Sequence, residues 1–159
     1  MKEGIVEVAT DCTRSSAMRP GWHRACILMA SRDQGEAHAV GQEVLKVGSG
    51  WLRTYCRTSD LMEYPPNCAV AGVILATGDE PEEIEESLKW ARRRWPHCPL
   101  TVVADSGGDE HELVARRNGA SFLTRPVTAA QWSAIVAHAT GMDRFTGRRE
   151  QSRLDLATS

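Results

Sequence analysis

The chain has 159 residues, and its 19 Lys or Arg against 21 Asp or Glu give a formal net charge of −2 at neutral pH. This balance argues against a nucleic-acid-binding protein, because such proteins gather an excess of positive charge. With 42% hydrophobic residues the chain is too apolar for disorder, and its length suits one domain. The longest nearly apolar run, residues 68–76, is about half as long as the roughly 18 residues that suggest a membrane span. Composition therefore predicts a soluble protein of one domain.

The cysteines and the N-terminus indicate a reducing compartment. The five cysteines are an odd number without a Cys-x-x-Cys pair, which argues against a disulfide or zinc framework. Glu3 and Glu7 interrupt the only apolar stretch before Thr10, and no signal-peptide core follows. We expect a cytoplasmic protein whose thiols stay reduced.

The first third of the chain predicts one strand and one helix. Residues 1–22 show no sustained period and are expected to form an irregular arm. Residues 24–31 form a short apolar run that ends abruptly in charged residues, which indicates a buried strand. Asp33 is a suitable N-cap for a helix that ends at Gly48, with apolar residues at helical spacing between them.

The middle third predicts two strands and the clearest helix. Residues 51–57 alternate large apolar with polar residues, as in a strand with one wet side at the edge of a sheet, and residues 58–67 allow one or two helical turns. Residues 68–76 predict a central strand buried on both faces. Pro81 fits the first turn of the next helix, which has glutamates at its start and arginines at its end. Its expected buried stripe is Ile84, Leu88, Ala91 and Trp95.

The last third repeats the alternation. Residues 100–104 predict a strand, and residues 110–118 a helix that buries Leu113 and Val114 and ends at Gly119. Residues 121–124 predict a last strand, after which Thr128 caps a helix. The inner face of that helix is expected to hold Trp132, Ile135, Val136 and Ala139. The polar residues 141–159 are expected to form a flexible tail.

Five strand–helix units predict an α/β fold, with a parallel sheet and helices on both faces. The predicted organisation is an arm over residues 1–22, a domain over residues 23–140 and a tail over residues 141–159. In such sheets the functional edge lies at the carboxyl ends of the strands.

Residues 25–139 resemble the receiver domain of bacterial response regulators. Residues 118–127, Asn-Gly-Ala-Ser-Phe-Leu-Thr-Arg-Pro-Val, look like the family's Gly-Ala, apolar strand and Lys-Pro between its fourth and fifth helices. Trp95-Pro96 followed by Pro99-Leu100 looks like the family's turn into its fourth strand. The resemblance implies a flavodoxin-like sheet of five parallel strands in the order 2-1-3-4-5.

The residues of receiver chemistry are replaced in this chain. The family's phosphate-accepting Asp aligns with Ala76, or with Thr77 after a slip of one residue. Its acidic pair that holds Mg²⁺ aligns with Ser31 and Arg32, and a guanidinium cannot ligate a metal. Its hydroxyl residue and its Lys align with Ala104 and Arg125. The resemblance therefore implies a degenerate receiver that is not phosphorylated, and Arg125 is expected to bridge to Asp79 or Asp105 across the pocket.

A receiver-like fold without the residues for phosphoryl transfer suggests a regulatory protein that acts by binding other proteins. In the family, the face formed by the fourth helix, fifth strand and fifth helix binds the partner proteins. A homodimer that forms through this face is one possible arrangement. The corresponding residues of this chain are Glu112, Arg116, Arg117, Arg125, Gln131 and Trp132. Trp132 also fits the buried stripe of its own helix, so core packing is a second interpretation of this residue.

Three other functions have weaker support in the sequence. The runner-up is a small-molecule sensor that uses the vacated pocket, open or closed according to Arg32 and Arg125. Catalysis by Asp79, Asp105, His111 and their neighbours is less expected, because such loop residues usually cap helices in solvent. Arg92–Arg94 with the tail arginines could bind nucleic acid, but such runs usually face solvent at helix ends. We expect no enzyme activity, cofactor or metal.

Overall fold

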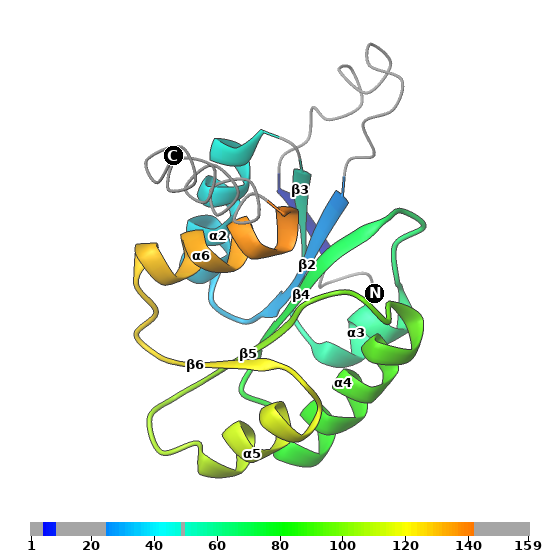
Figure 1. The fold of residues 1–159 in the computed structure, drawn as a ribbon, viewed down its shortest axis with the longest axis vertical. Coiled ribbons are helices and arrows are strands. Elements are labelled where there is room, and N and C mark those ends of the chain that lie inside the picture. Colours follow the sequence, from blue (N-terminus) through cyan, green and yellow to red (C-terminus); the bar gives the residue numbers. More distant parts are fainter. Residues whose placement is uncertain (1–4, 9–24, 49, 142–159) are drawn as a thin grey trace, which may run out of the picture.

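The computed structural model describes residues 5–8, 25–48 and 50–141, and these form one sheet flanked by helices (Figure 1). The strands run in the order β1-β3-β2-β4-β5-β6. Their bounds are β1 Ile5–Val8, β2 Ala25–Ser31, β3 Gly50–Tyr55, β4 Val70–Ala76, β5 Leu100–Ala104 and β6 Ser121–Thr124. Strands β2 to β6 are all parallel, so the order β3-β2-β4-β5-β6 confirms the predicted 2-1-3-4-5 sheet.

Strand β1 corrects two predictions. It pairs antiparallel with β3, with Ile5 opposite Tyr55 and Val8 opposite Leu52. Residues 5–8 are therefore not irregular, and β3 is not an edge strand. Four residues are too few to show a sequence period, but the β-branched Ile5, Val6 and Val8 suit the strand that the open edge of β3 accepts. The rest of the predicted arm and the tail after Gly141 lie outside the described residues.

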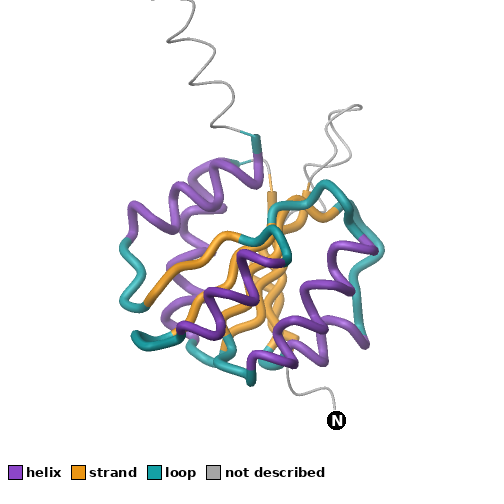
Figure 2. The backbone as a smooth tube through the Cα atoms, turned by 60° about the horizontal axis from the view of Figure 1, so that its bottom comes forward, coloured by secondary structure: helices purple, strands orange, loops and turns teal. Residues whose placement is uncertain are grey.

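The helices divide between the two faces of the sheet. Their bounds are α2 Gln34–Val47, α3 Thr58–Glu63, α4 Pro81–Arg94, α5 Asp109–Arg117 and α6 Ala129–Thr140. Helices α2 and α6 pack together on one face, and α3, α4 and α5 lie side by side on the other (Figures 1 and 2). The fold is thus the three-layer arrangement expected from the alternating elements.

Local signals begin and end the helices as predicted. The Asp33 carboxylate accepts hydrogen bonds from the backbone N–H groups of Gly35 and Glu36, and Gly48 closes α2 with a φ of 72°. Thr128 and Gln131 form a reciprocal capping box at the start of α6. Pro81 begins α4, whose acidic first turn and basic last turn complement the helix dipole.

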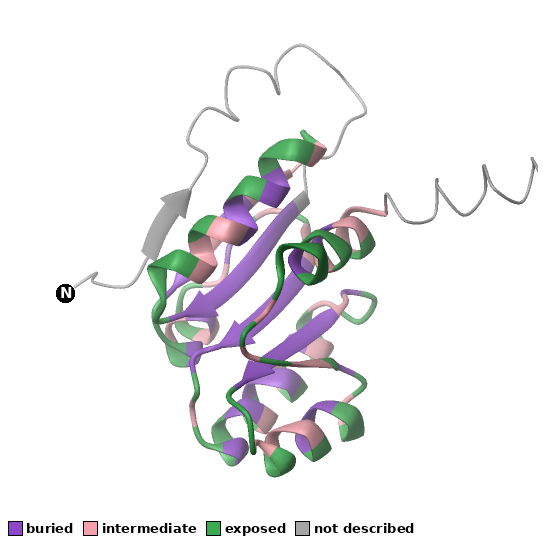
Figure 3. Cartoon of the chain, turned by 90° about the vertical axis from the view of Figure 1, so that its left-hand side faces the viewer, coloured by how far each residue is buried: buried purple, intermediate pink, exposed green. Residues whose placement is uncertain are grey.

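The core lies on both faces of the sheet, and the exposed residues lie on the outer sides of the helices (Figure 3). Trp132 is 3% exposed and packs in the cluster beneath α2 and α6. Leu113 is 64% exposed, so the prediction that it is buried was wrong. The adjacent Val114 and Ala115 take the inner side of α5, and successive helical residues point in different directions. No helix in the described ranges is both long and apolar enough to cross a membrane.

Candidate functional site

The predicted pocket residues meet at the carboxyl edge of the sheet. Ser31 and Ala76 end neighbouring strands and are paired in register, and Ala104 and Thr124 are paired in the same way. Ala76 and Ala104 are buried, and each contributes only a methyl group. The residue at the end of β4, where the resemblance places the family's phosphate-accepting Asp, is therefore a buried alanine.

Arg125 follows β6 and reaches across the strand ends to three elements. Its Nη2 donates to the backbone oxygen of Ala76 at 2.5 Å, at the end of β4. Its Nε donates to Glu36 Oε1 on α2 at 2.7 Å, and its Nη1 to Asp105 Oδ1 after β5 at 3.4 Å. We call these contacts the Arg125 bridge. They span the carboxyl edge of the sheet, and the bridge to Asp105 that the sequence suggested is present.

The charges of the Arg125 bridge stabilise one another. The Arg125 side chain is 24% exposed and that of Glu36 13%. Burial alone would lower the pKa of Arg125, but the hydrogen bond and charge of Glu36, with those of Asp105, raise it above its usual value. Sequence reasoning missed Glu36, which is 89 positions from Arg125. The only signal was its place in the first helical turn after β2, at the same sheet edge as Arg125.

Asp79, in the loop after β4, is the centre of a second group of hydrogen bonds at this edge of the sheet. Its Oδ1 accepts a hydrogen bond from Arg32 Nη2 at 3.0 Å. Its Oδ2 accepts hydrogen bonds from the hydroxyls of Thr58 and Thr77, both at 2.7 Å. The Asp79 side chain is 9% exposed. The alternative bridge from Arg125 to Asp79 is therefore wrong, because Arg32 and the two hydroxyls hold this carboxylate.

The pKa of Asp79 reflects these partners. Burial is the largest single effect and raises the pKa, but the hydrogen bonds from Thr77 and Thr58, together with the charge of Arg32, outweigh it. The pKa of Asp79 is therefore below its ordinary value of 3.8. Asp79 is a structural anion at neutral pH, with its oxygens already engaged.

Asp79 also connects the pocket to α5. Its backbone oxygen lies 2.8 Å from Nε2 of His111, in the first turn of that helix. Because a carbonyl oxygen only accepts, Nε2 carries the proton in this contact. The loop after β4 is thus tied to β2 through Arg32, to α3 through Thr58 and to α5 through His111.

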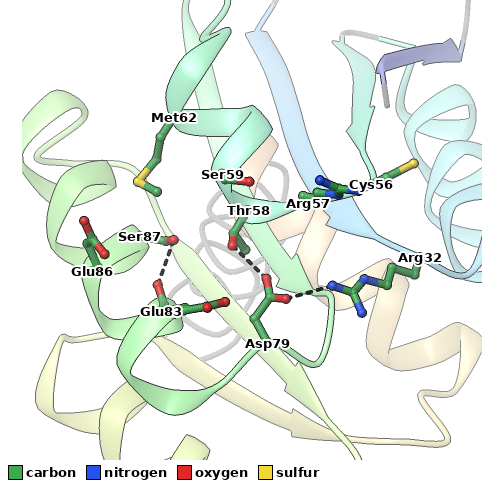
Figure 4. Close-up of a pocket in the computed structure, with 10 residues that line it drawn as sticks. All are labelled: Arg32, Cys56, Arg57, Thr58, Ser59, Met62, Asp79, Glu83, Glu86 and Ser87. Atoms are coloured by element: carbon green, nitrogen blue, oxygen red, sulfur yellow. Dashed lines mark hydrogen bonds and ion pairs between the residues drawn. The ribbon is translucent and has the colours of Figure 1, made fainter. Parts of the chain in front are cut away.

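A cavity of about 750 Å³ lies beside Asp79, between α3 and α4 (Figure 4). We call it the Asp79 cavity. One wall comes from the end of β2, the end of β3 and α3, and the other from the loop after β4 and α4. The residues that line it are Arg32, Cys56, Arg57, Thr58, Ser59, Met62, Asp79, Glu83, Glu86 and Ser87. Of the predicted pocket residues, only Arg32 belongs to this cavity.

The predicted interaction face is only partly a free surface. Trp132 is buried, which supports its interpretation as a core residue, and Arg125 is turned into the pocket. Arg117 reaches Glu85 on α4 at 2.5 Å, and Gln131 caps α6. Glu112 and Arg116 form an ion pair at 2.6 Å on the surface of α5.

The residues considered for catalysis and for nucleic-acid binding do not form one site. Asp79 is held by its hydroxyl partners, and Asp105 pairs with Arg125. Arg92 donates to backbone oxygens of Pro96, Cys98 and Gly119, so it joins α4 to the neighbouring turns. In the part of the chain that the structure describes, no three His, Cys, Asp or Glu side chains gather as metal ligands would.

Comparison with known proteins identifies the fold. No family model matches the chain, and no curated protein matches its sequence. The structure is similar to a response regulator receiver domain from Clostridium thermocellum, at 18% identity and a TM-score of 0.58, over 77% of this chain and 98% of that one. It is similar to a CheY-like response regulator from Mesorhizobium loti, at 22% identity and a TM-score of 0.59, over 73% and 98%. A putative pilus assembly protein from Burkholderia thailandensis gives 16% identity and a TM-score of 0.58, over 74% and 98%. The chain therefore has the fold of response-regulator receiver domains.

Proposed function

We propose that this protein is a cytoplasmic regulatory module of receiver fold that acts by protein binding, without catalysis and without phosphorylation. The observation that carries the proposal is the Arg125 bridge. A receiver accepts a phosphoryl group on a carboxylate beside a bound Mg²⁺, whereas this chain has Ala76 at the strand end and a guanidinium over it. A guanidinium has only donors and repels a divalent cation.

The Arg125 bridge also supports a single, constitutive conformation. One side chain joins the end of β4 to α2 and to the loop that leads into α5. These contacts form in the folded chain without any modification, so they hold the binding surface in one state.

The binding surface that we infer is the face of α5, β6 and α6, and its occupant is a second copy of this chain. Strand β6 ends the sheet of described residues, so its outer backbone groups have no strand partner there. Beside it, an apolar groove of about 260 Å³, which includes Leu123 and Ile135, lies between β6 and α6. The Glu112–Arg116 pair is self-complementary, because a two-fold axis would place each charge near its opposite.

Sedimentation velocity over a concentration series tests this proposal. The wild type is expected to dimerise, and Ser121→Arg, on the exposed side of β6, is expected to weaken the dimer at least tenfold. Gln42→Arg, on the exposed side of α2, is the matched control and should dimerise as the wild type does. A monomer at every concentration, or a dimer that forms only with Mg²⁺ and acetyl phosphate, would contradict the proposal.

A second function, ligand sensing, is favoured by one specific observation. The Arg125 bridge spans the carboxyl edge of the sheet, but the Asp79 cavity beside it has about 750 Å³ of space. That volume is within the range of roughly 300–1,000 Å³ typical of small-molecule sites. Asp79 lines the cavity and bonds to His111, so a ligand there would act on α5.

A further inference from the structure

The charges that line the Asp79 cavity are separated by sign. Arg32 and Arg57, which follow β2 and β3, lie on one side, and Glu83 and Glu86 of α4 lie on the other (Figure 4). Among the ion pairs of the described residues, none joins Arg57 to either glutamate. Opposite charges therefore face each other across the cavity without neutralising one another.

Asp79 does not compensate these charges fully. Its oxygens already accept hydrogen bonds from Thr58, Thr77 and Arg32. Arg32 donates to it through Nη2 alone, and the Arg32 side chain is 61% exposed. Because a guanidinium carries five N–H donors, Arg32 keeps donors for a second acceptor.

The separated charges favour a particular charge pattern in any ligand of the cavity. An anion that approaches Arg57 meets repulsion from the two glutamates, and a cation near Glu86 meets repulsion from the two arginines. A ligand with one charge of each sign satisfies both walls through charge-assisted hydrogen bonds. Between the charged walls, the Ser59 hydroxyl and the Met62 thioether supply a polar and an adaptable apolar contact.

We infer that the Asp79 cavity binds a zwitterion of the amino acid or short peptide class. The carboxylate lies at Arg32 and Arg57, and the ammonium group lies at Glu83 and Glu86. This inference rests on the ligand-sensing function proposed above. It adds the chemical class of the ligand and the residues that select it.

NMR titration of the full ¹⁵N-labelled chain with trialanine tests the inference. Trialanine is expected to cause saturable shifts in the resonances of Arg57, Ser59 and Glu86. N-acetyl-trialanine lacks the positive end and trialanine amide lacks the negative end, so each is expected to bind at least tenfold more weakly. Equal binding of all three peptides would overturn the inference.

Two variants assign the ends of the ligand. Arg57→Gln is expected to lose part of the preference for trialanine over its amide, because one of the two arginines at the carboxylate is gone. Glu86→Gln is expected to lose part of the preference for trialanine over the N-acetyl form. Arg93→Gln and Glu82→Gln, exposed residues of α4 outside this cavity, are the controls and should keep both preferences.

Acetate and propylamine, titrated in parallel, distinguish a failure of the zwitterion class from a failure of the ligand-sensing function. If either shifts the cavity resonances saturably while trialanine does not, the zwitterion class is wrong and the cavity remains a ligand site. If neither they nor trialanine shifts those resonances, the ligand-sensing function fails together with the inference.

Discussion

Replacing Arg125 with alanine removes the guanidinium that joins β4, α2 and the loop after β5. Three losses follow from the structure. The bond to Glu36 is charge-assisted between two half-buried side chains and is worth about 1.5–3 kcal/mol. The Ala76 carbonyl loses its donor, at about 1 kcal/mol. Asp105 is 83% exposed, so its long contact adds little. We expect a total loss of about 3 kcal/mol in the free energy of unfolding.

Urea unfolding, followed by circular dichroism, measures this loss directly. A decrease of about 3 kcal/mol corresponds to a fall of about 6–12 °C in Tm for a chain of this length. Arg125→Lys keeps the charge without the planar fork and is expected to cost about half as much as Arg125→Ala. With Glu36→Ala added, the double variant should be less destabilised than the sum of its single variants, because the two residues share one interaction.

The matched control is Lys89→Ala, which removes an exposed cation that pairs with Glu85 on the same helix, outside the proposed binding surface. Its cost is expected to stay within about 0.5 kcal/mol. If Arg125→Ala costs no more than Lys89→Ala, then Arg125 is not a structural bridge and the reasoning from its contacts is refuted.

Three further predictions concern other parts of the molecule. The pKa of Asp79 is lower when folded than unfolded, so its stabilisation is present above the ordinary value of 3.8 and is lost as pH falls through the folded-state pKa. Stability measured against pH should therefore fall more steeply in that acid range for the wild type than for Asp79→Asn, and equal slopes would count against the network. Among the described cysteines, the exposed Cys56 should react with iodoacetamide first; Cys98 should react only on unfolding, because burial raises its pKa to about 12. Rapid labelling of Cys98 in the native protein, detected by peptide mass, would contradict its burial. Gly72→Ala places a Cβ 2.9 Å from that of Ala139, so thermal unfolding should show a loss of about 1–3 kcal/mol that Ala139→Gly restores. No loss would mean that α6 does not pack so closely on β4.

The fold was largely predictable because local signals and tertiary packing agree. Asp33, Gly48, Pro81 and Thr128 mark helix ends by chemistry that acts within a few residues. The apolar runs of the parallel strands are continuous because both of their faces are covered. Strand β1 was not predicted because its four residues form a strand only by pairing with the edge of β3, which is distant in the sequence. The burial of Leu113 was predicted wrongly because its neighbours Val114 and Ala115 take the inner side of α5.

The sequence predicted which residues lie at the candidate site, but not which side chains contact one another. The strand-end rule placed Arg32, Ala76 and Arg125 at one edge of the sheet. No sequence pattern could assign Arg32 to Asp79 and Arg125 to Glu36, because both pairings depend on side-chain reach across the edge. The cavity between α3 and α4 could not be predicted from the sequence either, because its volume depends on how the two helices pack.

Native intact-mass spectrometry, before and after incubation with Mg²⁺ and acetyl phosphate, tests the central claim most directly. One spectrum reads both the covalent mass and the number of subunits. The account predicts an unchanged mass and the same dimer fraction with and without the phosphoryl donor. A chain that gains a phosphoryl group would contradict it, because a residue such as Thr77 or Asp79 would then be a working acceptor, and so would a dimer fraction that changes with the phosphoryl donor.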